Sequence, residues 1–241
     1  MSKDNQETYI RRLLEDAQVS AAQTMHLLEE AERAMLEHDQ GGDEDPGEGD
    51  DDGPEPDHEP IAYGSWPPPA AMVSGPASDP KIAPLLEDME AYLASHEELT
   101  GVGWSAQEIC TMPKAPGRPV AIPVRGLWHH MVPTLALYEE LRELLGQPCS
   151  LRGYRPPDYN AAVGGASRSA HLWFAALDVY APVDHCRELA ELAAEIFAAR
   201  PDLQVGLGIY GYPHSSNIHI DVGAKGRRTW ADTQQWLSNA K

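Results

Sequence analysis

The sequence has 241 residues, with 38 Asp and Glu against 18 Lys and Arg, and a formal net charge of −20. This length allows one hydrophobic core with an appendage. No basic cluster of the kind that neutralises phosphates is present, so nucleic acid is not an expected partner, and no stretch is long and apolar enough for a membrane span. The three cysteines, Cys110, Cys149 and Cys186, include no CxxC pair, which excludes a cysteine zinc cluster.

The first 40 residues are predicted to contain one amphipathic helix. Apolar residues recur at steps of three and four between Ile10 and Met35, with charged residues on the other faces. Residues 6–38 are therefore expected either to self-associate as a weak coiled coil or to dock on their own domain. The N-terminus lacks the basic start and apolar run of a signal peptide, which favours a cytoplasmic location.

Residues 41–80 are predicted to be a disordered linker. The stretch from Gly41 to Pro60 holds ten acidic residues in 20 and no Lys or Arg, so it cannot bury enough apolar surface to offset its chain entropy. A Pro-rich connector follows. The composition becomes globular at Lys81, which predicts a folded domain over residues 81–241.

Helices and short strands alternate irregularly through this domain. Apolar periodicity predicts helices over 84–99, 128–146, 183–202 and, at the end, 228–241. Gly146 is expected to end the second of these, because glycine tolerates the left-handed conformation of a helix terminus. Strands are expected within 118–124, 148–157, 204–212 and 216–223. The order has no regular βαβ rhythm, so we predict an α+β fold with a small, mainly antiparallel sheet flanked by helices.

His171 and Asp178 stand seven residues apart in an apolar segment, "SAHLWFAALDV". On a continuous helix they would be about 10 Å apart along the axis, and on a strand about 23 Å apart on opposite faces. They can bind one metal ion only if the chain bends between them, with His171 on a loop and Asp178 in a strand. Without such a bend they are ordinary residues of a buried segment.

A third ligand is expected from "NIHID". On a strand His219 and Asp221 share one face, while Ile218 and Ile220 point to the core. Two histidines and one aspartate, with one position left open, are an acceptable ligand set for catalytic zinc.

Two segments resemble a known family. "SLRGYRPPDYNAAVGGASRSAHLWFAALDV" (150–179) and "GIYGYPHSSNIHIDVG" (208–223) are similar to the two motifs of D-alanyl-D-alanine carboxypeptidase-like zinc peptidases. That group includes L-alanyl-D-glutamate endopeptidases and shares its fold with the hedgehog signalling domain. The resemblance covers about residues 120–230. It implies a Zn²⁺-dependent peptidase that hydrolyses bonds involving D-amino acids in peptidoglycan stem peptides or cross-links, and hence an unidentified route from the cytoplasm to the cell wall.

The resemblance also implies roles for individual residues. His171, Asp178 and His219 match the zinc ligands, Arg155 matches an arginine that contacts substrate and steadies the developing oxyanion, and Ser169 matches a residue that hydrogen-bonds substrate.

The sequence departs from the family pattern in two places. Phe174 replaces a glycine that many members have three residues after the first histidine, and Ser216 and Asn217 occupy the positions at which members carry an acidic or histidine base. Asp221 and His214 are the remaining candidates for the base, although Asp221 is equally suited to fixing the His219 imidazole. Without a base, the domain would be a weak enzyme or a binding and assembly module.

Other side chains have both a functional and a structural interpretation. Trp128, Trp173, Trp230 and Trp236 suit either a substrate cleft or a core. Arg152 and Arg168 suit either an acidic peptide or simple solvation.

Overall fold

The structure, a computed structural model, describes Tyr63 and residues 68–240. These residues form a mixed α+β domain, which confirms the predicted fold class. The helix predicted over residues 6–38 and the acidic segment 41–60 lie outside the described residues. Among the helices that the structure describes, none has the length and apolar character needed to cross a membrane.

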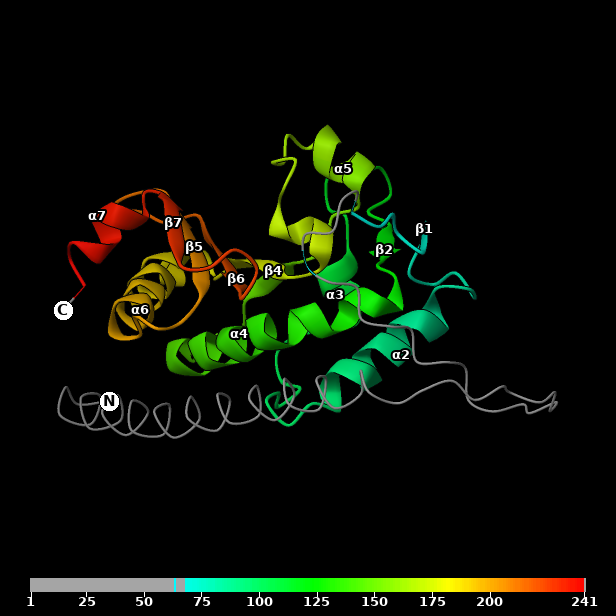
Figure 1. The fold of residues 1–241 in the computed structure, drawn as a ribbon, viewed down its shortest axis with the longest axis horizontal. Coiled ribbons are helices and arrows are strands. Elements are labelled where there is room, and N and C mark those ends of the chain that lie inside the picture. The colour runs from blue at the N-terminus through cyan, green and yellow to red at the C-terminus, as the bar shows by residue number, and fades with distance from the viewer. Residues whose placement is uncertain (1–62, 64–67, 241) are drawn as a thin grey trace, which may run out of the picture. The chain divides into compact units, whose positions relative to one another are not determined.

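A five-stranded sheet forms the centre of the domain (Figure 1). Its spatial order is β3 (Ser150–Arg152), β4 (Ala176–Tyr180), β6 (Asn217–Val222), β5 (Val205–Tyr210) and β7 (Arg228–Ala231). The neighbouring strands are antiparallel except for β5 and β7. The sheet is therefore mainly antiparallel, as predicted.

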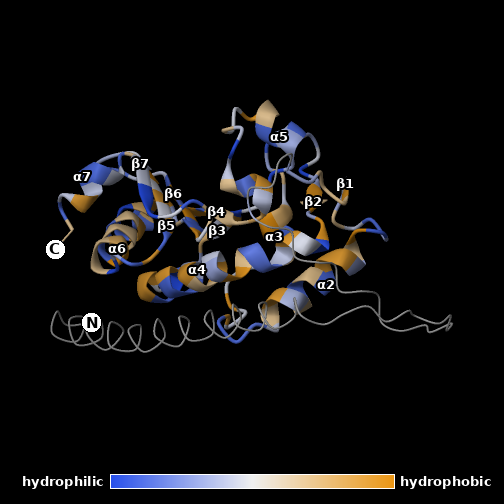
Figure 2. Cartoon of the chain, in the orientation of Figure 1, coloured by the Kyte–Doolittle hydropathy of each residue, from blue (hydrophilic) through white to orange (hydrophobic). Residues whose placement is uncertain are grey.

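One face of this sheet is covered by α4 (Val132–Leu145) and α6 (Cys186–Ala199). Leu207 and Ile220 point toward these helices, since both line a small apolar cavity together with residues of α4 and α6. Polar and apolar residues alternate along both helices, as expected for helices that are buried on one side (Figure 2). Gly146 ends α4 at a φ of 66°, the left-handed conformation that the sequence predicts. The opposite face of the sheet is left for polar side chains.

The N-terminal part of the described chain packs beside α4. It contains β1 (Val73–Gly75), α2 (Ala83–Ala94), α3 (Ala106–Cys110), β2 (Val120–Ile122) and the 3₁₀ helix η1 (Arg125–Met131). Strands β1 and β2 form a separate antiparallel pair. Tyr63 also contacts the domain, through the rings of His130 and Trp173. Ordered structure thus begins before residue 81, because β1 gains its hydrogen bonds from a strand far along the chain.

The remaining elements are short. They are α5 (Pro157–Ala162), the 3₁₀ helices η2 (Ala170–Trp173) and η3 (Val183–His185), and α7 (Thr233–Leu237). The prediction of one helix over 228–241 is wrong in part. Arg228–Ala231 forms strand β7, and only α7 is helical. Pairing with β5 explains this difference, because it satisfies the backbone groups of 228–231 at the sheet edge.

Buried Glu139 anchors the loop that leads to α3. Its carboxylate accepts hydrogen bonds from the backbone N–H groups of residues 100–102, from the Thr100 hydroxyl and from the Trp104 indole. The loop is thereby fixed to α4, the helix that also packs against the central sheet.

Candidate metal centre

The chain bends between His171 and Asp178. His171 lies on η2, which is capped by the Ser169 side chain, and Asp178 lies within β4. Phe174 ends η2 at a φ of 53°, in the left-handed region that glycine adopts more readily. The family resemblance predicts glycine at this position, and burial of the Phe174 ring beside Tyr154 offsets the backbone strain. The predicted bend is therefore present.

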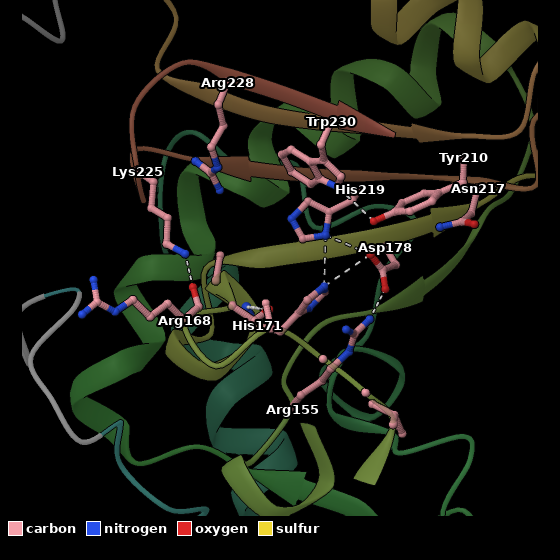
Figure 3. A pocket seen from close by; sticks show the side chains of 16 residues that line it. Arg155, Arg168, His171, Asp178, Tyr210, Asn217, His219, Lys225, Arg228 and Trp230 are labelled. Atoms are coloured by element: carbon pink, nitrogen blue, oxygen red, sulfur yellow. Dashed lines mark hydrogen bonds and ion pairs between the residues drawn. The ribbon is translucent and has the colours of Figure 1, made fainter. Parts of the chain in front are cut away.

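The bend and strand β6 bring three side chains together (Figure 3). Nε2 of His171 is 3.1 Å from Nδ1 of His219, and Oδ1 of Asp178 is 3.3 Å and 3.0 Å from these two nitrogens. We call these three residues the ligand triangle. In a tetrahedral zinc site with bonds of about 2.0 Å, ligand atoms are about 3.3 Å apart. The donor set and its dimensions therefore fit Zn²⁺.

Each member of the ligand triangle is held by a second interaction behind it. Nδ1–H of His171 donates to the carbonyl oxygen of Gly153, which leaves Nε2 free for a metal. Nε2–H of His219 donates to Asp221 at 3.1 Å, which leaves Nδ1 free. Oδ2 of Asp178 accepts from Arg155, which leaves Oδ1 free. Such partners set the tautomer and the orientation of metal ligands.

The surroundings of the ligand triangle shift the pKa values of all three members. Burial lowers the pKa of His171, which keeps its imidazole neutral. Burial acts to raise the pKa of Asp178, but His171, His219 and Arg155 outweigh it and hold this pKa well below its usual value. Burial acts to lower the pKa of His219, but hydrogen bonds to Asp178 and Asp221 outweigh it and raise the pKa. A neutral imidazole and an ionised carboxylate are the forms that bind metal, so the shifts at His171 and Asp178 favour a metal ion, whereas at His219 a metal ion competes with a proton.

Two glycines near the site lie where a larger side chain would collide with its neighbours. A Cβ on Gly153 would lie 2.3 Å from the Ile109 side chain, so glycine is needed where this carbonyl meets His171. A Cβ on Gly165 would lie 2.1 Å from Oδ1 of Asn160. Asn160 is buried and donates from Nδ2 to the carbonyl of Ala166, which ties down the loop before His171.

Two glycines of β5 leave room for large side chains on the face of the sheet that carries His219. A Cβ on Gly206 would collide with Asp221 and Arg228, and one on Gly208 would collide with the Trp230 indole. Arg228 instead donates to Oδ2 of Asp221 at 2.6 Å, and Trp230 packs edge-on against His219 at 4.9 Å between ring centroids. The residues behind and beside His219 thus depend on glycine in the neighbouring strand.

The ligand triangle lies in a cavity of about 490 Å³. Of the residues predicted to form the site, Arg155 and Ser169 line this cavity together with His171, Asp178 and His219. Neither candidate for the base lines it. His214 is exposed on the loop between β5 and β6, and Asp221 is completely buried behind His219. This position favours the alternative role of Asp221, in which it fixes the imidazole.

The structure decides between the two interpretations of the tryptophans and arginines. Trp230 lines it, whereas Trp128, Trp173 and Trp236 are buried in the core. Arg168 lines the cavity, and Arg152 instead lies over the Tyr180 ring.

Sequence reasoning missed three residues that line the cavity. Lys225 and Arg228 fall just before β7 and at its start, and Tyr210 falls at the end of β5. The alternation in "VGLGIY" was the available signal, because Val205, Leu207 and Ile209 are buried while the intervening residues face the site.

Comparison with known proteins agrees with this geometry. Residues 106–221 match the model of a family described as Peptidase M15. A search of curated proteins found no match. The matched range begins at α3 and ends at Asp221, so it contains the whole ligand triangle, Arg155 and Ser169. Residues 106–221 are therefore a domain of the Peptidase M15 family, and its two histidines and one aspartate form a site that suits zinc.

Proposed function

We propose that the domain is a zinc-dependent peptidase that hydrolyses peptide bonds involving D-amino acids in peptidoglycan stem peptides or cross-links. The observation that carries this proposal is the ligand triangle, which has the size of one face of a zinc tetrahedron and lies in a cavity beside Arg155. The family match supports a peptidase of the general kind. The choice of D-amino acid bonds rests on the two sequence motifs.

The protein residues have separate tasks in this proposal. His171, Asp178 and His219 would hold Zn²⁺, which when bound lowers the pKa of a coordinated water toward 7 and polarises a carbonyl group. Arg155 is fixed by Asp178, so its guanidinium is preoriented beside the ligands. A guanidinium held in this way stabilises either a substrate carboxylate or the negative charge that develops on the carbonyl oxygen. Ser169 lies at the cavity wall, where its hydroxyl can contact the peptide.

The charge of the cavity suits an acidic peptide. Although the whole chain carries a formal charge of −20, the cavity is lined by Arg155, Arg168, Lys225 and Arg228, and among the described lining residues only Asp178 is acidic. Burial, with the positive charges of Arg228 and Arg168, lowers the pKa of Lys225. A carboxylate on the substrate would relieve this mutual repulsion.

Digestion of defined muropeptides tests the proposed function. The purified zinc-loaded protein should release new amines from peptides with D-amino acid linkages, and mass analysis of the products identifies the bond. A strong chelator should abolish cleavage, and added zinc should restore it. Cleavage that persists in His171→Ala would contradict the proposal, because the variant lacks one ligand.

A second candidate function is a catalytically weak or inactive module that binds peptidoglycan peptides. The specific observation in its favour concerns the base. Of the described residues that line the cavity, every carboxylate or imidazole belongs to the ligand triangle. Neither Asp221 nor His214 is placed to take a proton from water in the cavity. Tight binding of muropeptides without new amines would favour this function over the peptidase.

Two further expectations from the sequence stay predictions. Self-association through residues 6–38 predicts a larger sedimentation coefficient for the full chain than for a chain starting at residue 63. The cytoplasmic location, with an unidentified route to the wall, predicts recovery of the protein in the cytoplasmic fraction of the producing cells.

A further inference from the structure

We propose that Tyr210 is a catalytic residue, whose phenol O–H donates a hydrogen bond to the carbonyl oxygen of the bound peptide as negative charge develops there. This inference rests on the proposed function and extends it to a residue that neither sequence motif assigns. Tyr210 keeps its proton throughout, so its role is to stabilise charge rather than to transfer a proton.

Strand register places Tyr210 on the face of the ligand triangle. In the antiparallel pair of β5 and β6, Tyr210 is opposite Asn217, and Gly208 is opposite His219. Because side chains alternate along a strand, Tyr210 and His219 emerge on the same side of the sheet. Tyr210 lines the cavity with the ligand triangle and is 38% exposed, so a substrate can reach its hydroxyl.

A hydrogen bond from Trp230 fixes the direction of the Tyr210 hydroxyl proton. The indole Nε1 of Trp230 lies 2.9 Å from the Tyr210 oxygen. Indole N–H can only donate, so the Tyr210 oxygen is the acceptor in this bond. The phenol proton must then point elsewhere, and within the part of the chain that the structure describes no other group is bonded to this hydroxyl. The proton is thus available to a ligand in the cavity.

Trp230 is the positioning residue for this arrangement. The missing side chain of Gly208 lets the indole lie close to β5, where it reaches Tyr210 with its N–H and His219 with its ring. Trp230 lies beyond the family-matched range, which ends at residue 221. The indole therefore connects the orientation of one metal ligand to that of the phenol.

Tyr210 complements Arg155 in the cavity. Figure 3 shows the two side chains on opposite sides of Asp178, with the Tyr210 oxygen directed toward the ligand triangle. A peptide carbonyl beside the ligands would have a guanidinium on one side and a phenol on the other. Two donors aimed at the same developing charge are the arrangement that stabilises an oxyanion.

Tyr210→Phe tests the proposal because it removes only the hydroxyl. We expect kcat for muropeptide cleavage to fall about 100-fold with KM little changed, which is the lower end of the effect of removing one donor to a developing charge. Trp230→Phe should give a smaller loss in kcat, because the phenol remains but its direction is no longer fixed. Tyr212→Phe is the matched control: Tyr212 is exposed and its oxygen accepts a hydrogen bond from Asn239, so kcat should not change.

Binding measurements separate this role from a structural one. A phosphinate analogue of D-Ala-D-Ala presents tetrahedral anionic oxygens. By calorimetry, Tyr210→Phe should bind it about tenfold or more weakly than wild type, while affinity for the plain dipeptide, zinc affinity and melting temperature stay the same. A Tyr210→Phe variant that loses zinc or melts early would show a structural role and overturn the proposal.

Different results would overturn the peptidase function and the donor role of Tyr210. If wild type cleaves muropeptides and Tyr210→Phe cleaves them equally fast, the inference about Tyr210 is wrong and the peptidase function stands. If wild type does not cleave but binds the phosphinate through Tyr210, the peptidase function is wrong and the donor role stands. Failure of wild type to bind the phosphinate and to cleave any of the muropeptides overturns both.

Discussion

Replacement of Asp221 by asparagine should weaken zinc binding about 10- to 100-fold, which corresponds to about 1.4–2.7 kcal/mol. Asp221 is completely buried and accepts hydrogen bonds from Nε2 of His219 at 3.1 Å and from Arg228 at 2.6 Å. The amide is isosteric but neutral, so the His219 imidazole loses the negative partner that makes it a stronger ligand. Arg228 loses its counter-charge at the same time.

Competition against a chromophoric chelator measures this change at neutral pH. Asp184→Asn is the matched control, because the same substitution is made at an exposed residue that does not line the cavity. If Asp221 acts as the general base instead, Asp221→Asn should bind zinc as tightly as wild type and lose only kcat. Wild-type zinc affinity in Asp221→Asn would therefore refute the positioning role assigned to this residue.

Three further predictions concern stability. Zinc at about 100 times its Kd should stabilise the domain by about 2.7 kcal/mol, a rise in Tm of roughly 5–11 °C by calorimetry, and no rise would argue against a metal site in the native fold. Glu139→Gln should lower the free energy of unfolding by about 2–4 kcal/mol in urea, because its carboxylate accepts from five donors; Glu98→Gln, at an exposed position, should have no effect. Phe174→Gly should also destabilise, since losing a buried aromatic ring costs about 3–5 kcal/mol whereas relief of the left-handed backbone returns about 1–2 kcal/mol; a more stable variant would show that strain dominates.

The ligand triangle could be predicted because the family resemblance implied its three members and the spacing of two of them indicated a bend. A separation of seven positions between His171 and Asp178 fits neither one helix nor one strand, so a shared metal required the bend that η2 and Phe174 provide. The isoleucines flanking His219 are buried, as an alternating strand pattern predicts.

The groups that hold the side chains of the ligand triangle in place could be predicted only in part. The carbonyl of Gly153, which fixes His171, is a backbone group and leaves no signature in side-chain chemistry. The sequence pattern predicts a terminal helix that includes Trp230, because the four residues of β7 are too few to show the alternation of a strand. Its pairing with β5 is a long-range contact that local sequence does not encode.

The position of Asp221 shows what strand parity can and cannot establish. The alternation of side chains along a strand correctly places Asp221 on the same face as His219. It does not tell whether Asp221 faces the cavity or lies on the side of the imidazole away from it. The structure places it behind, where it is sealed by Arg228. A general base must therefore be sought among groups that reach the cavity, rather than at Asp221.

The zinc content of the purified protein tests the central claim most directly. Metal analysis after dialysis should find one zinc per chain in wild type and far less in His171→Ala, because His171 supplies one of the three ligand atoms. Equal zinc in the two proteins, or no zinc in wild type after loading, would contradict the metal centre on which the proposed peptidase depends.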